Sequence, residues 1–549
     1  MWGRTARYAA AVATAFLAVP SMAMAADTYV DDDSGNDANP CTSPGAPCLT
    51  ILGGIGKAGA SDTVRVDGGN YGEFVSLSGG KSLVEQDFNT TDGDSQATID
   101  SGALGPAIAV PAGGSAGEIR GFTVRSDALP VSLEGPATLT GNNFDDPDAN
   151  THVNLLQGSG AASVTTNTFT DTPADTDGQF GLSTITSGSP TIAGNTFENL
   201  QTAIHIANGN ATVSGNTITG ARAGGSNVGV AIQVVSGSPT IVANDINTPA
   251  QPLNAFGILI SEFAGPTATG ATLRRNEVYD HRGGVRTNDT EGTVTLNGDV
   301  IAGNTESGIL AVDNAAGGDE GDVTATNVTA FDNNNDVVLL ETHIELDSSI
   351  VGDPVGDFNN GTCAIAFSRG PTTTPGGTGC AGFQTTAAPQ FVNPGADNYH
   401  LQAGSPMIDA GDPANPGFVV DLDGQSRAVA GTCGGTARRD IGADEFAPNC
   451  PPPPPPPPGA DTNPPDTEIT KAPKRKTPKR KARIEFSSDE TGSSFACKLD
   501  KREFAACTSP FRKKVKRGRH SFQVRAIDDS GNADPTPAVH EWKVKRKRR

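Results

Sequence analysis

Short apolar segments alternate with polar turns along the middle of the chain, and one six-residue phrase recurs among them. The phrase has the form apolar-x-x-Asn-x-apolar, as in IAGNTF at 192–197 and VSGNTI at 213–218. Its clearest copies centre on Asn142, Asn167, Asn195, Asn216, Asn244 and Asn276. Successive asparagines are 25, 28, 21, 28 and 32 residues apart. Repetition at this interval predicts an architecture of stacked, similar units.

The repeats predict strands rather than helices. They are rich in Val, Ile, Thr, Gly, Asn and Ser, and they lack the apolar spacing of an amphipathic helix. Second strands lie between the Asn phrases, for example GVAIQVVSG from 229 and FGILISE from 256. Their period of two places Val230, Ile232 and Val234 on one face. We therefore expect each repeat to be one coil, with two or more strands around a shared apolar interior.

The recurring asparagine predicts a structural ladder at one corner of the coil. Stacked strands lie about 4.8 Å apart, so equivalent residues of successive coils stand directly above one another. An asparagine at such a position tolerates a left-handed turn, and its amide can hydrogen-bond to the asparagines above and below. Unrelated Asn-rich turns are the alternative, but they do not explain apolar residues on both sides of six copies.

On these phrases, residues from about 62 to 350 resemble the right-handed parallel β-helix family, which includes pectate-lyase-like and NosD-like proteins. The resemblance implies an all-β fold: a right-handed single-stranded parallel β-helix, or solenoid, followed by a small immunoglobulin-like β-sandwich. It implies no particular activity, because this scaffold hosts many chemistries. The expected organisation is a signal peptide at 1–25, an N-terminal cap at 26–62, the β-helix at 63–362, a C-terminal closing region at 363–446, a proline-rich linker at 447–465 and the basic sandwich at 466–549.

The first 25 residues have the pattern of a signal peptide. Arg4 and Arg7 precede an apolar stretch from Ala9 to Val19, and Ala-Met-Ala at 23–25 suits cleavage after Ala25. No later segment has the roughly 20 apolar residues of a transmembrane helix. We expect a secreted protein, either extracellular or associated with the cell surface.

Eight cysteines follow one another as local pairs. In an exported protein this pattern favours disulfides that close short loops, although spacing alone does not fix the pairing. A zinc site would need Cys-x-x-Cys spacing or clustered histidines, which the sequence lacks. The predicted pairs are Cys41 with Cys48, Cys363 with Cys380, Cys433 with Cys450, and Cys497 with Cys507.

Both ends of the coil need a cover, because open strand edges promote aggregation. At the first end, the apolar segment from Leu49 to Ala58 suits a capping helix. At the other end, LQAGSPMIDAGD, DLDGQSR and DIGADEF within 389–446 resemble a choice-of-anchor-type closing region of secreted bacterial β-helix proteins. Such a region implies that attachment to a cell falls to the segments on its C-terminal side.

A run of eight prolines at 451–458 separates two bodies of opposite charge. It is expected to form an extended spacer of about 25 Å, at about 3.1 Å per residue. Residues 460–549 hold 24 Lys and Arg against 12 Asp and Glu, whereas the chain before them holds 16 basic and 50 acidic residues. The alternating strands from 466 onwards resemble bacterial immunoglobulin-like modules, but basic clusters replace their usual neutral residues.

The basic clusters predict an anion-binding surface. The expected partner is an acidic wall polymer or acidic polysaccharide. Nucleic acid and the acidic coil of the same or another molecule are further options, and a merely solvated surface is the alternative. No nucleic-acid motif is present, and aromatic residues do not interleave with the basic clusters. The protein is expected to be a monomer.

No cofactor is expected, and calcium is the one ion that the sequence leaves open. Asp421 and Asp423 in DLDG, and the acids of VDDDSGND from Asp31 to Asp37, offer oxygen ligands. Neither stretch has the spacing of an EF-hand loop, and acidic turn residues are more often solvated.

The face of the second strands carries few groups for catalysis. In register, its outward residues are expected to be His205, Gln233, Leu259, Arg286 and Leu310, a row without a carboxylate pair. Glycan hydrolysis requires two carboxylates. The best local candidate for a polar site is YDHRGGVR at 279–286, with Asp280, His281, Arg282 and Arg286, although a polar turn explains it equally well.

The sequence supports two hypotheses about function. The first is a non-catalytic secreted or surface protein whose coil serves adhesion or contacts a glycan and whose basic module is the tether. The second is a polysaccharide-degrading enzyme of the pectate-lyase-like superfamily, either a lyase or a glycoside hydrolase, with acids on loops that the repeat pattern does not place.

Overall fold

The computed structural model describes residues 26–89, 96–127, 129–145, 151–171, 180–221, 228–248, 255–261, 269–288, 290–313, 322–352, 358–359, 361–371, 382–414, 420–450 and 461–545. The chain divides into two compact units, Met1–Cys450 and Pro451–Arg549. Both are built mainly of β-strands. None of the helices in the described ranges is long and apolar enough to cross a membrane. The predicted signal peptide and proline run lie outside these ranges.

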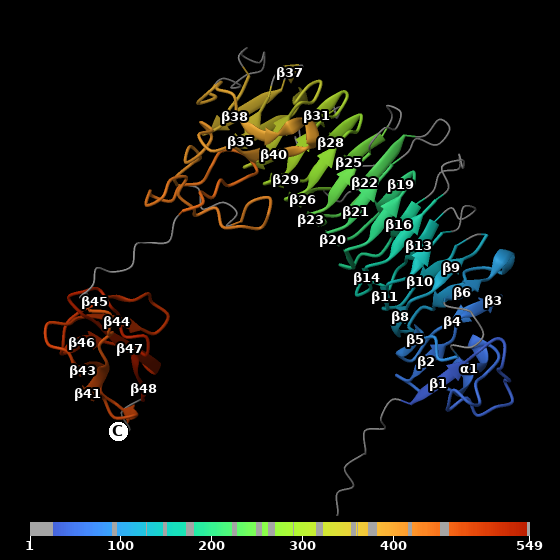
Figure 1. Cartoon of the computed structure of the whole chain (residues 1–549), viewed down its shortest axis with the longest axis horizontal. Coiled ribbons are helices and arrows are strands. Elements are labelled where there is room, and N and C mark those ends of the chain that lie inside the picture. The colour runs from blue at the N-terminus through green and yellow to red at the C-terminus, as the bar shows by residue number, and fades with distance from the viewer. Residues whose placement is uncertain are drawn as a thin grey trace, which may run out of the picture. The chain divides into compact units, whose positions relative to one another are not determined.

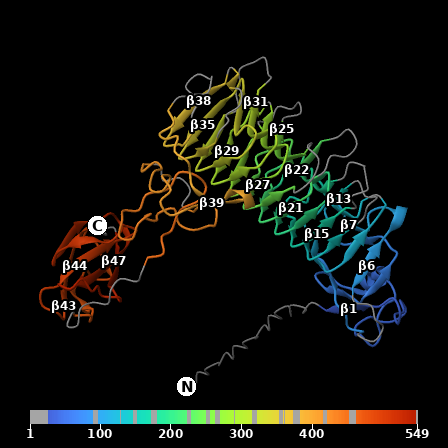
Figure 2. The same ribbon diagram turned by 45° about the horizontal axis from the view of Figure 1, so that its top comes forward.

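The first unit is a coil of three long parallel sheets, which Figures 1 and 2 show from two directions. Each turn of the chain adds one strand to sheet 1, then one to sheet 2 and one to sheet 3. Every strand pairs in parallel with its counterparts one turn earlier and later. This is the parallel β-helix that the repeated phrases predicted.

Sheet 1 has 14 strands within the described ranges. They are β1 (Asp27–Val30), β2 (Thr63–Val66), β5 (Lys81–Glu85), β8 (Ala116–Arg120), β11 (Thr138–Thr140), β14 (Ser163–Thr165), β17 (Thr191–Ala193), β20 (Thr212–Ser214), β23 (Thr240–Val242), β26 (Ala271–Arg274), β29 (Val294–Asn297), β32 (Val323–Thr326), β35 (His343–Asp347) and β38 (Thr362–Ala366).

Sheet 2 has 12 described strands. They are β3 (Gly69–Tyr71), β6 (Ala97–Asp100), β9 (Thr123–Arg125), β12 (Asn143–Phe144), β15 (Thr168–Thr170), β18 (Thr196–Glu198), β21 (Thr217–Thr219), β24 (Asp245–Asn247), β27 (Glu277–Tyr279), β30 (Val300–Ala302), β33 (Thr329–Phe331) and β36 (Ile350–Val351). A short 3-10 helix, η1 (Gly102–Leu104), follows β6.

Sheet 3 also has 12 strands in the part of the chain that the structure describes. They are β4 (Val75–Ser76), β7 (Ile108–Val110), β10 (Val131–Leu133), β13 (Thr151–Leu155), β16 (Phe180–Thr184), β19 (Thr202–Ile206), β22 (Gly229–Val234), β25 (Ala255–Ser261), β28 (Gly283–Asn288), β31 (Ser307–Val312), β34 (Val337–Leu340) and β37 (Phe358–Asn359).

Apolar side chains from all three sheets fill the interior of the coil in columns. Because the register is kept from strand to strand, apart from a shift between β5 and β8, the same position of each coil stacks on its counterpart. Phe144, Phe169 and Phe197 are fully buried in one such column, with ring centroids 4.7 and 4.6 Å apart. The register then continues through Ile218 and Ile246. Along each strand, the apolar residues of the alternating pattern thus face the interior of the coil and the polar residues face outwards.

The six predicted ladder asparagines form one buried, hydrogen-bonded column at the corner between sheets 1 and 2. Asn195 shows the pattern: its backbone N–H and its side-chain Nδ2 both donate to Asn216 Oδ1, at 2.9 and 3.0 Å. Its Nδ2 also donates to the backbone carbonyl of Val164, in the preceding coil, at 2.9 Å. Each side chain therefore satisfies backbone groups that the corner would otherwise leave without partners. The six members are Asn142, Asn167, Asn195, Asn216, Asn244 and Asn276.

The left-handed residue of this corner is the one before the asparagine, which corrects the expectation that the asparagine itself adopts that conformation. Gly141, Gly194 and Gly215 have φ between 60° and 63°. Thr166, Ala243 and Arg275 occupy the same place with φ between 52° and 56°, whereas none of the six asparagines has a positive φ. The glycine of the repeated phrase is therefore the residue that makes the turn.

The column ends on a carboxylate. Asn276 donates its backbone N–H and its Nδ2 to Asp299 Oδ1, at 2.9 and 2.8 Å. The other oxygen, Oδ2, accepts the backbone N–H of Asn297 at 2.7 Å. A second column at the corner between sheets 2 and 3 runs from Asn304 through Asn333 and also ends on an aspartate, Asp336.

Helix α1 (Ile51–Lys57) stands at the first end of the coil, where the sequence suggested a capping helix. Thr50 caps it by accepting the backbone N–H of Gly53, and the Glu73 carboxylate accepts those of Ile51 and Leu52. Ile51 is fully buried in the main core. The cap also contributes β1, the first strand of sheet 1, so it is continuous with the coil.

The coil continues beyond the predicted boundary at 362. β38 is the last strand of sheet 1, and Arg369 forms parallel bridges with Ile350 and Thr385. The closing region after it contains β39 (Phe391–Asn393), η2 (Pro394–Ala396) and β40 (Asn398–Leu401). β39 and β40 form an antiparallel pair.

The closing region covers the outer face of sheet 2 rather than only the last coil. In early coils the outward positions of sheet 2 are polar, as at Thr217 and Asp245. From β27 onwards most outward positions are apolar, although Glu277 and Thr329 remain polar, and the apolar ones pack with apolar side chains of the closing region into a second buried cluster. The cluster comprises Tyr279, Val300, Ala302, Ile350, Phe391, Tyr399, Leu401, Met407, Ile441 and Ala443.

Three of the predicted disulfides are present among the described residues: Cys41–Cys48, Cys433–Cys450 and Cys497–Cys507. Cys363 is also disulfide-bonded. Its predicted partner, Cys380, lies outside the described residues.

The second unit packs two small sheets over one core. One sheet has the order β41 (Thr467–Lys471), β43 (Lys481–Ser488), β46 (Phe511–Lys514). The other has the order β42 (Lys476–Thr477), β48 (Ala538–Val544), β47 (Gly518–Ile527), β44 (Ser494–Leu499), β45 (Ala505–Cys507). Ile484, Phe486, Phe522, Val524 and Trp542 are buried between the sheets. We call this unit the basic module.

Candidate functional site

The structure separates the residues that the sequence singled out as candidates for catalysis. His281 is only 2% exposed, and its Nε2 lies 2.8 Å from Thr248 Oγ1. Burial lowers the pKa of His281 to about 4, so its ring is neutral at neutral pH. Asp280 forms the adjacent left-handed turn, whereas Arg286 lies on the outer face of sheet 3. Asp280, His281 and Arg286 therefore do not form one site, and His281 is part of the corner of the coil.

The expected row on the outer face of sheet 3 is present. Strand register places His205, Gln233, Leu259, Arg286 and Leu310 beside one another on five successive strands. At about 4.8 Å per strand, His205 and Arg286 are about 14 Å apart. No member of this row carries a carboxylate.

Two arginines converge on one aromatic ring at this face. The guanidinium carbons of Arg286 and Arg282 lie 5.2 and 5.6 Å from the ring centroid of Phe256. Phe256 is 4% exposed, in keeping with the two side chains above it. Arg282 also forms an ion pair with Glu306 at 2.8 Å, and Arg286 Nε donates to Asn288 Oδ1 at 2.9 Å. We call these five residues the paired-arginine site.

The electrostatics of the paired-arginine site favour an anion. Among the described residues it holds two guanidinium groups and the carboxylate of Glu306. Burial lowers the pKa of Arg286, and repulsion from Arg282 lowers it further, although arginine stays charged at any physiological pH. A ligand carboxylate or sulfate would relieve that repulsion, and a guanidinium can bind such a group in bidentate fashion.

At the other end of the row, an imidazole lies against an aromatic ring. The rings of His205 and Phe180 are stacked, with centroids 4.7 Å apart, and Ser183 Oγ lies 3.1 Å from His205 Nδ1. Burial lowers the pKa of His205 below its usual value, which keeps the ring neutral at neutral pH. This end therefore offers a flat surface with a hydrogen-bonding edge, whereas the other end offers positive charge.

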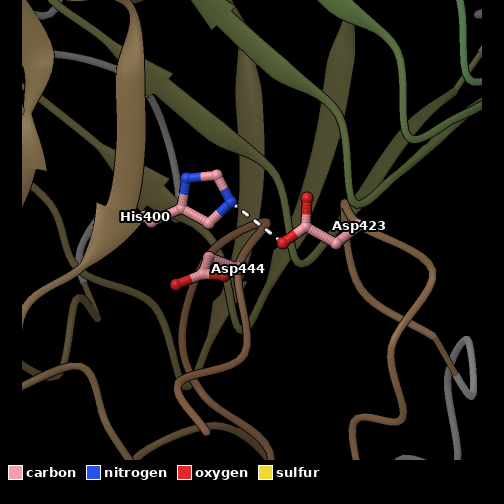
Figure 3. A group of neighbouring side chains, drawn as sticks. All are labelled: His400, Asp423 and Asp444. Carbon is pink, nitrogen blue, oxygen red and sulfur yellow. Dashed lines mark hydrogen bonds and ion pairs between the residues drawn. The ribbon is translucent and has the colours of Figure 1, made fainter.

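A second group of chemical interest lies where the closing region meets sheet 2. His400, Asp423 and Asp444 bring one nitrogen and two carboxylate oxygens within 4.8 Å of one another. Figure 3 shows the ring of His400 facing Asp423, with Asp444 beside them. His400 Nε2 is 3.0 Å from Asp423 Oδ2, and Asp444 Oδ2 accepts the backbone N–H of Leu401 at 2.7 Å. We call this group the His400 cluster.

The His400 cluster fits an ion pair better than a calcium site. Burial acts to lower the pKa of His400, but the charge of Asp444 and the hydrogen bond that the ring donates to Asp423 raise it overall, which favours the imidazolium form. The ring Nδ1 is also engaged, 2.8 Å from Asn398 Oδ1. Calcium takes six to eight oxygen ligands, and an imidazole is not one of them. Asp421, which the sequence paired with Asp423 as a calcium candidate, accepts the backbone N–H of Gln425 within its own turn.

The acidic stretch near the N-terminus is likewise occupied by protein donors. Asp31 is buried, and its two oxygens accept the backbone N–H groups of Asp33 and Ser34, the Ser34 hydroxyl and the Asn89 amide. This arrangement stabilises a turn and leaves Asp31 with little capacity for a cation.

Two buried arginines hold the closing region together and dock it on the coil. Arg427 is buried, donates to the carbonyls of Val420, Gly442 and Ala443, and lies 3.9 Å from Glu445. The Arg439 guanidinium donates to Asn327 Oδ1 at 2.8 Å. The backbone N–H of Ala443 donates to Thr329 on the coil at 3.0 Å. The motif residues in DLDGQSR and DIGADEF thus have structural roles.

Sequence reasoning named Arg282 and Arg286 but missed Phe256 and Glu306. Phe256 stands one coil earlier, and only the register, which pairs it with Gly283, brings it beneath the arginines. A signal was available: Gly283 has no side chain, and a Cβ there would come within 2.8 Å of the Phe256 ring. A glycine beside an aromatic residue in the neighbouring coil marks such a close approach.

Comparison with known proteins identifies the coil. The family described as the right handed beta helix region matches residues 109–246 and 151–330. No curated protein matches the sequence. Among solved structures, XylC in complex with xylose covers 76% of this chain and 98% of its own, with 9% identity and a TM-score of 0.42. A rhamnogalacturonan lyase covers 67% of this chain and 91% of its own, with 11% identity and a TM-score of 0.28.

The two solved structures are too dissimilar to this chain to inform its activity. The family match falls within the described sheets, where three parallel strands per turn wind around one apolar interior. The coil, which contains the matched residues, therefore has the fold of a right-handed parallel β-helix.

Proposed function

We propose that this chain is an exported, non-catalytic β-helix protein that binds an acidic glycan or wall polymer, with the coil as a rigid binding body and the basic module as a tether. The observation that carries the proposal is the paired-arginine site. Two guanidinium groups over one ring suit the recognition of an anion, whereas hydrolysis of a glycan needs two carboxylates and Glu306 is the one carboxylate beside them among the described residues.

The row on sheet 3 gives the ligand a path. A polymer lying along the coil axis would cross one strand about every 4.8 Å, from the paired-arginine site to the His205–Phe180 end about 14 Å away. Charged groups would bind at the arginines, and a sugar face would lie over the rings.

Two further observations support export and tethering. Three disulfides close short loops in both units, and disulfides persist in oxidising compartments. The basic module carries an excess of positive charge, which attracts acidic polymers.

The test measures the binding of hexagalacturonate by isothermal titration calorimetry. The variant Arg282→Gln/Arg286→Gln is expected to lose binding at the coil, with at least a tenfold weaker association at that site, or about 1.4 kcal/mol. The control is Arg65→Gln/Arg120→Gln, which removes the same charge from sheet 1, where both arginines have acidic partners. Equal effects of the two variants would contradict a site at Arg282 and Arg286.

The same protein, incubated with pectin, polygalacturonate and alginate, distinguishes binding from degradation. We expect neither unsaturated products nor new reducing ends. Turnover of any of these polymers by the wild-type chain would overturn the non-catalytic proposal in favour of a lyase or a hydrolase.

A further inference from the structure

A groove of about 850 Å³ lies on the basic module, along its five-stranded sheet. Two acids, Asp500 and Glu541, line it together with a larger number of basic side chains. The basic lining residues are Arg475, Lys476, Lys501, Arg519 and Lys543.

Three of these basic residues form a row across adjacent strands. Lys476 of β42 pairs with Lys543 of β48, and Lys543 pairs with Arg519 of β47. All three are exposed, and within the described residues no ion pair involves any of them. Like charges directly opposite each other destabilise a sheet. The row therefore does not serve the stability of the fold, and a polyanion would offset its repulsion.

Of the two acids in the groove, Glu541 lies two residues before Lys543 on β48, whereas Asp500 is already engaged. The Asp500 carboxylate lies 2.9 Å from His520 Nδ1 and accepts the backbone N–H of Ser521 at 3.1 Å. His520 Nε2 in turn lies 2.9 Å from the carbonyl of Lys516. Asp500 thus pairs with an imidazole, which leaves Arg519 and Lys543 to face the groove as cations.

We infer that this groove is a second glycan site, in which a linear acidic polysaccharide lies across β42, β48 and β47 with its carboxylates at Lys476, Lys543 and Arg519. The inference rests on the proposed function, since it locates the tether on the module. Neighbouring strands are about 4.8 Å apart, so the row matches a linear polymer with one charge per sugar unit.

The groove suits a glycan better than single-stranded nucleic acid. Its aromatic lining residue, Trp542, is only 3% exposed and packs with the rings of His520 and His540 at 5.3 and 5.9 Å. Binding of single strands relies on exposed rings for base stacking. A ligand at Lys476, Lys543 and Arg519 would therefore be held by charge contacts alone.

The experiment counts binding sites on the full-length chain. Calorimetric titration of wild-type protein with hexagalacturonate is expected to show two binding events per chain. Arg519→Gln/Lys543→Gln should remove one of them, and the coil variant Arg282→Gln/Arg286→Gln should remove the other. The matched control is Arg512→Gln/Lys514→Gln on β46, which takes one Arg and one Lys from exposed positions of the other sheet and should leave both events.

Each outcome separates the inference from the proposed function. If the wild-type chain binds no hexagalacturonate, the proposed function fails together with the inference. If the groove variant keeps both events, or if the control variant loses as much as the groove variant, the inference alone fails.

Tighter binding of oligothymidylate than of hexagalacturonate, weakened by the groove variant, would assign the groove to nucleic acid and overturn the glycan assignment. The conservative variant Arg519→Lys/Lys543→Arg should restore the lost event and shows that charge, not folding, is responsible.

Discussion

At the scale of single residues, the buried asparagine column is the main device that stacks the coils. From Asn167 to Asn276, each amide accepts two N–H donors from the coil before it and donates to the coil after it. Asparagine suits the position because its side chain has both an acceptor and a two-proton donor. An aliphatic residue of similar size would leave the same backbone groups without partners.

A truncation in the middle of the column tests this role. Asn216→Ala removes the acceptor of two N–H groups of Asn195 and the donor to Asn244. We expect a loss of about 3 kcal/mol or more in the free energy of unfolding, since each unsatisfied buried group costs about 1–3 kcal/mol. The midpoint of urea unfolding measures it. Asn210→Ala is the control: this exposed asparagine accepts a single N–H, from Ser238, and its loss should shift the midpoint far less.

The carboxylate at the end of the column predicts a pH dependence. Burial raises the pKa of Asp299 to about 7, although hydrogen bonds from Asn276 and Asn297 act against it. The folded state thus holds this proton more tightly than the unfolded state, and the contribution of Asp299 to stability rises as the pH falls through 7. Between pH 8 and pH 6, wild-type protein should gain more stability against urea than Asp299→Asn. Asp100→Asn, at an exposed turn, should behave like wild type.

The repeated phrase revealed which side chains would stack, but not how the corner turns. Asparagine recurs with apolar neighbours, and that pattern is visible because the interior and the corner must be alike in every coil. The left-handed residue before it varies among Gly, Thr, Ala and Arg, so no residue type marks it. Its conformation follows from the stacking, which outweighs the preference of the single residue.

At the scale of elements, the closing region and sheet 2 share one apolar interface. From β27 onwards most outward positions of sheet 2 become apolar and are covered by the closing region, although Glu277 and Thr329 remain polar. That change was present in the sequence, in Tyr279, Val300 and Ala302. It became meaningful only once the register showed which alternate positions face outwards, since an apolar residue in a strand can face either way.

Removing apolar volume from this interface should loosen the closing region and leave the coil intact. Ile441 is fully buried among residues of both elements. Ile441→Ala is expected to cost about 2–5 kcal/mol locally, so limited proteolysis should cut within 390–446 faster than in wild type. The control is Val392→Ala in the same region, whose side chain is largely exposed. Equal cleavage rates for the two variants would argue against this interface as the attachment.

At the scale of the whole molecule, charge is distributed between the units in opposite senses, yet both proposed sites are basic. The coil and its closing region are strongly acidic overall, and the paired-arginine site is a local exception on that surface. The basic module has an excess of positive charge, and the row of Lys476, Lys543 and Arg519 brings part of it together. Two sites for one acidic polymer on a single chain would strengthen attachment through effective concentration, without any additional contact.

Sequence reasoning reached the fold more completely than the candidate site, for a physical reason. A stack repeats the same contacts in every coil, so its pattern recurs along the chain and can be read from one sequence. The paired-arginine site occurs once and joins residues from three coils, Phe256, Arg286 and Glu306, whose proximity depends on exact register. Single sites of this kind leave no recurring pattern, and the same holds for the row of Lys476, Lys543 and Arg519.

The asparagine column also has a direction. Each side chain of the column donates through Nδ2 to the next side chain on its C-terminal side, and the last of them, Asn276, donates to the carboxylate of Asp299. A coil duplicated between Asn142 and Asn276 would form the same hydrogen bonds to the coils before and after it. A coil added after Asp299 would meet a carboxylate, which accepts hydrogen bonds, in place of an amide, which donates them. Such a protein can lengthen in evolution by the insertion of turns in its middle, while the contact between Asn276 and Asp299 is kept.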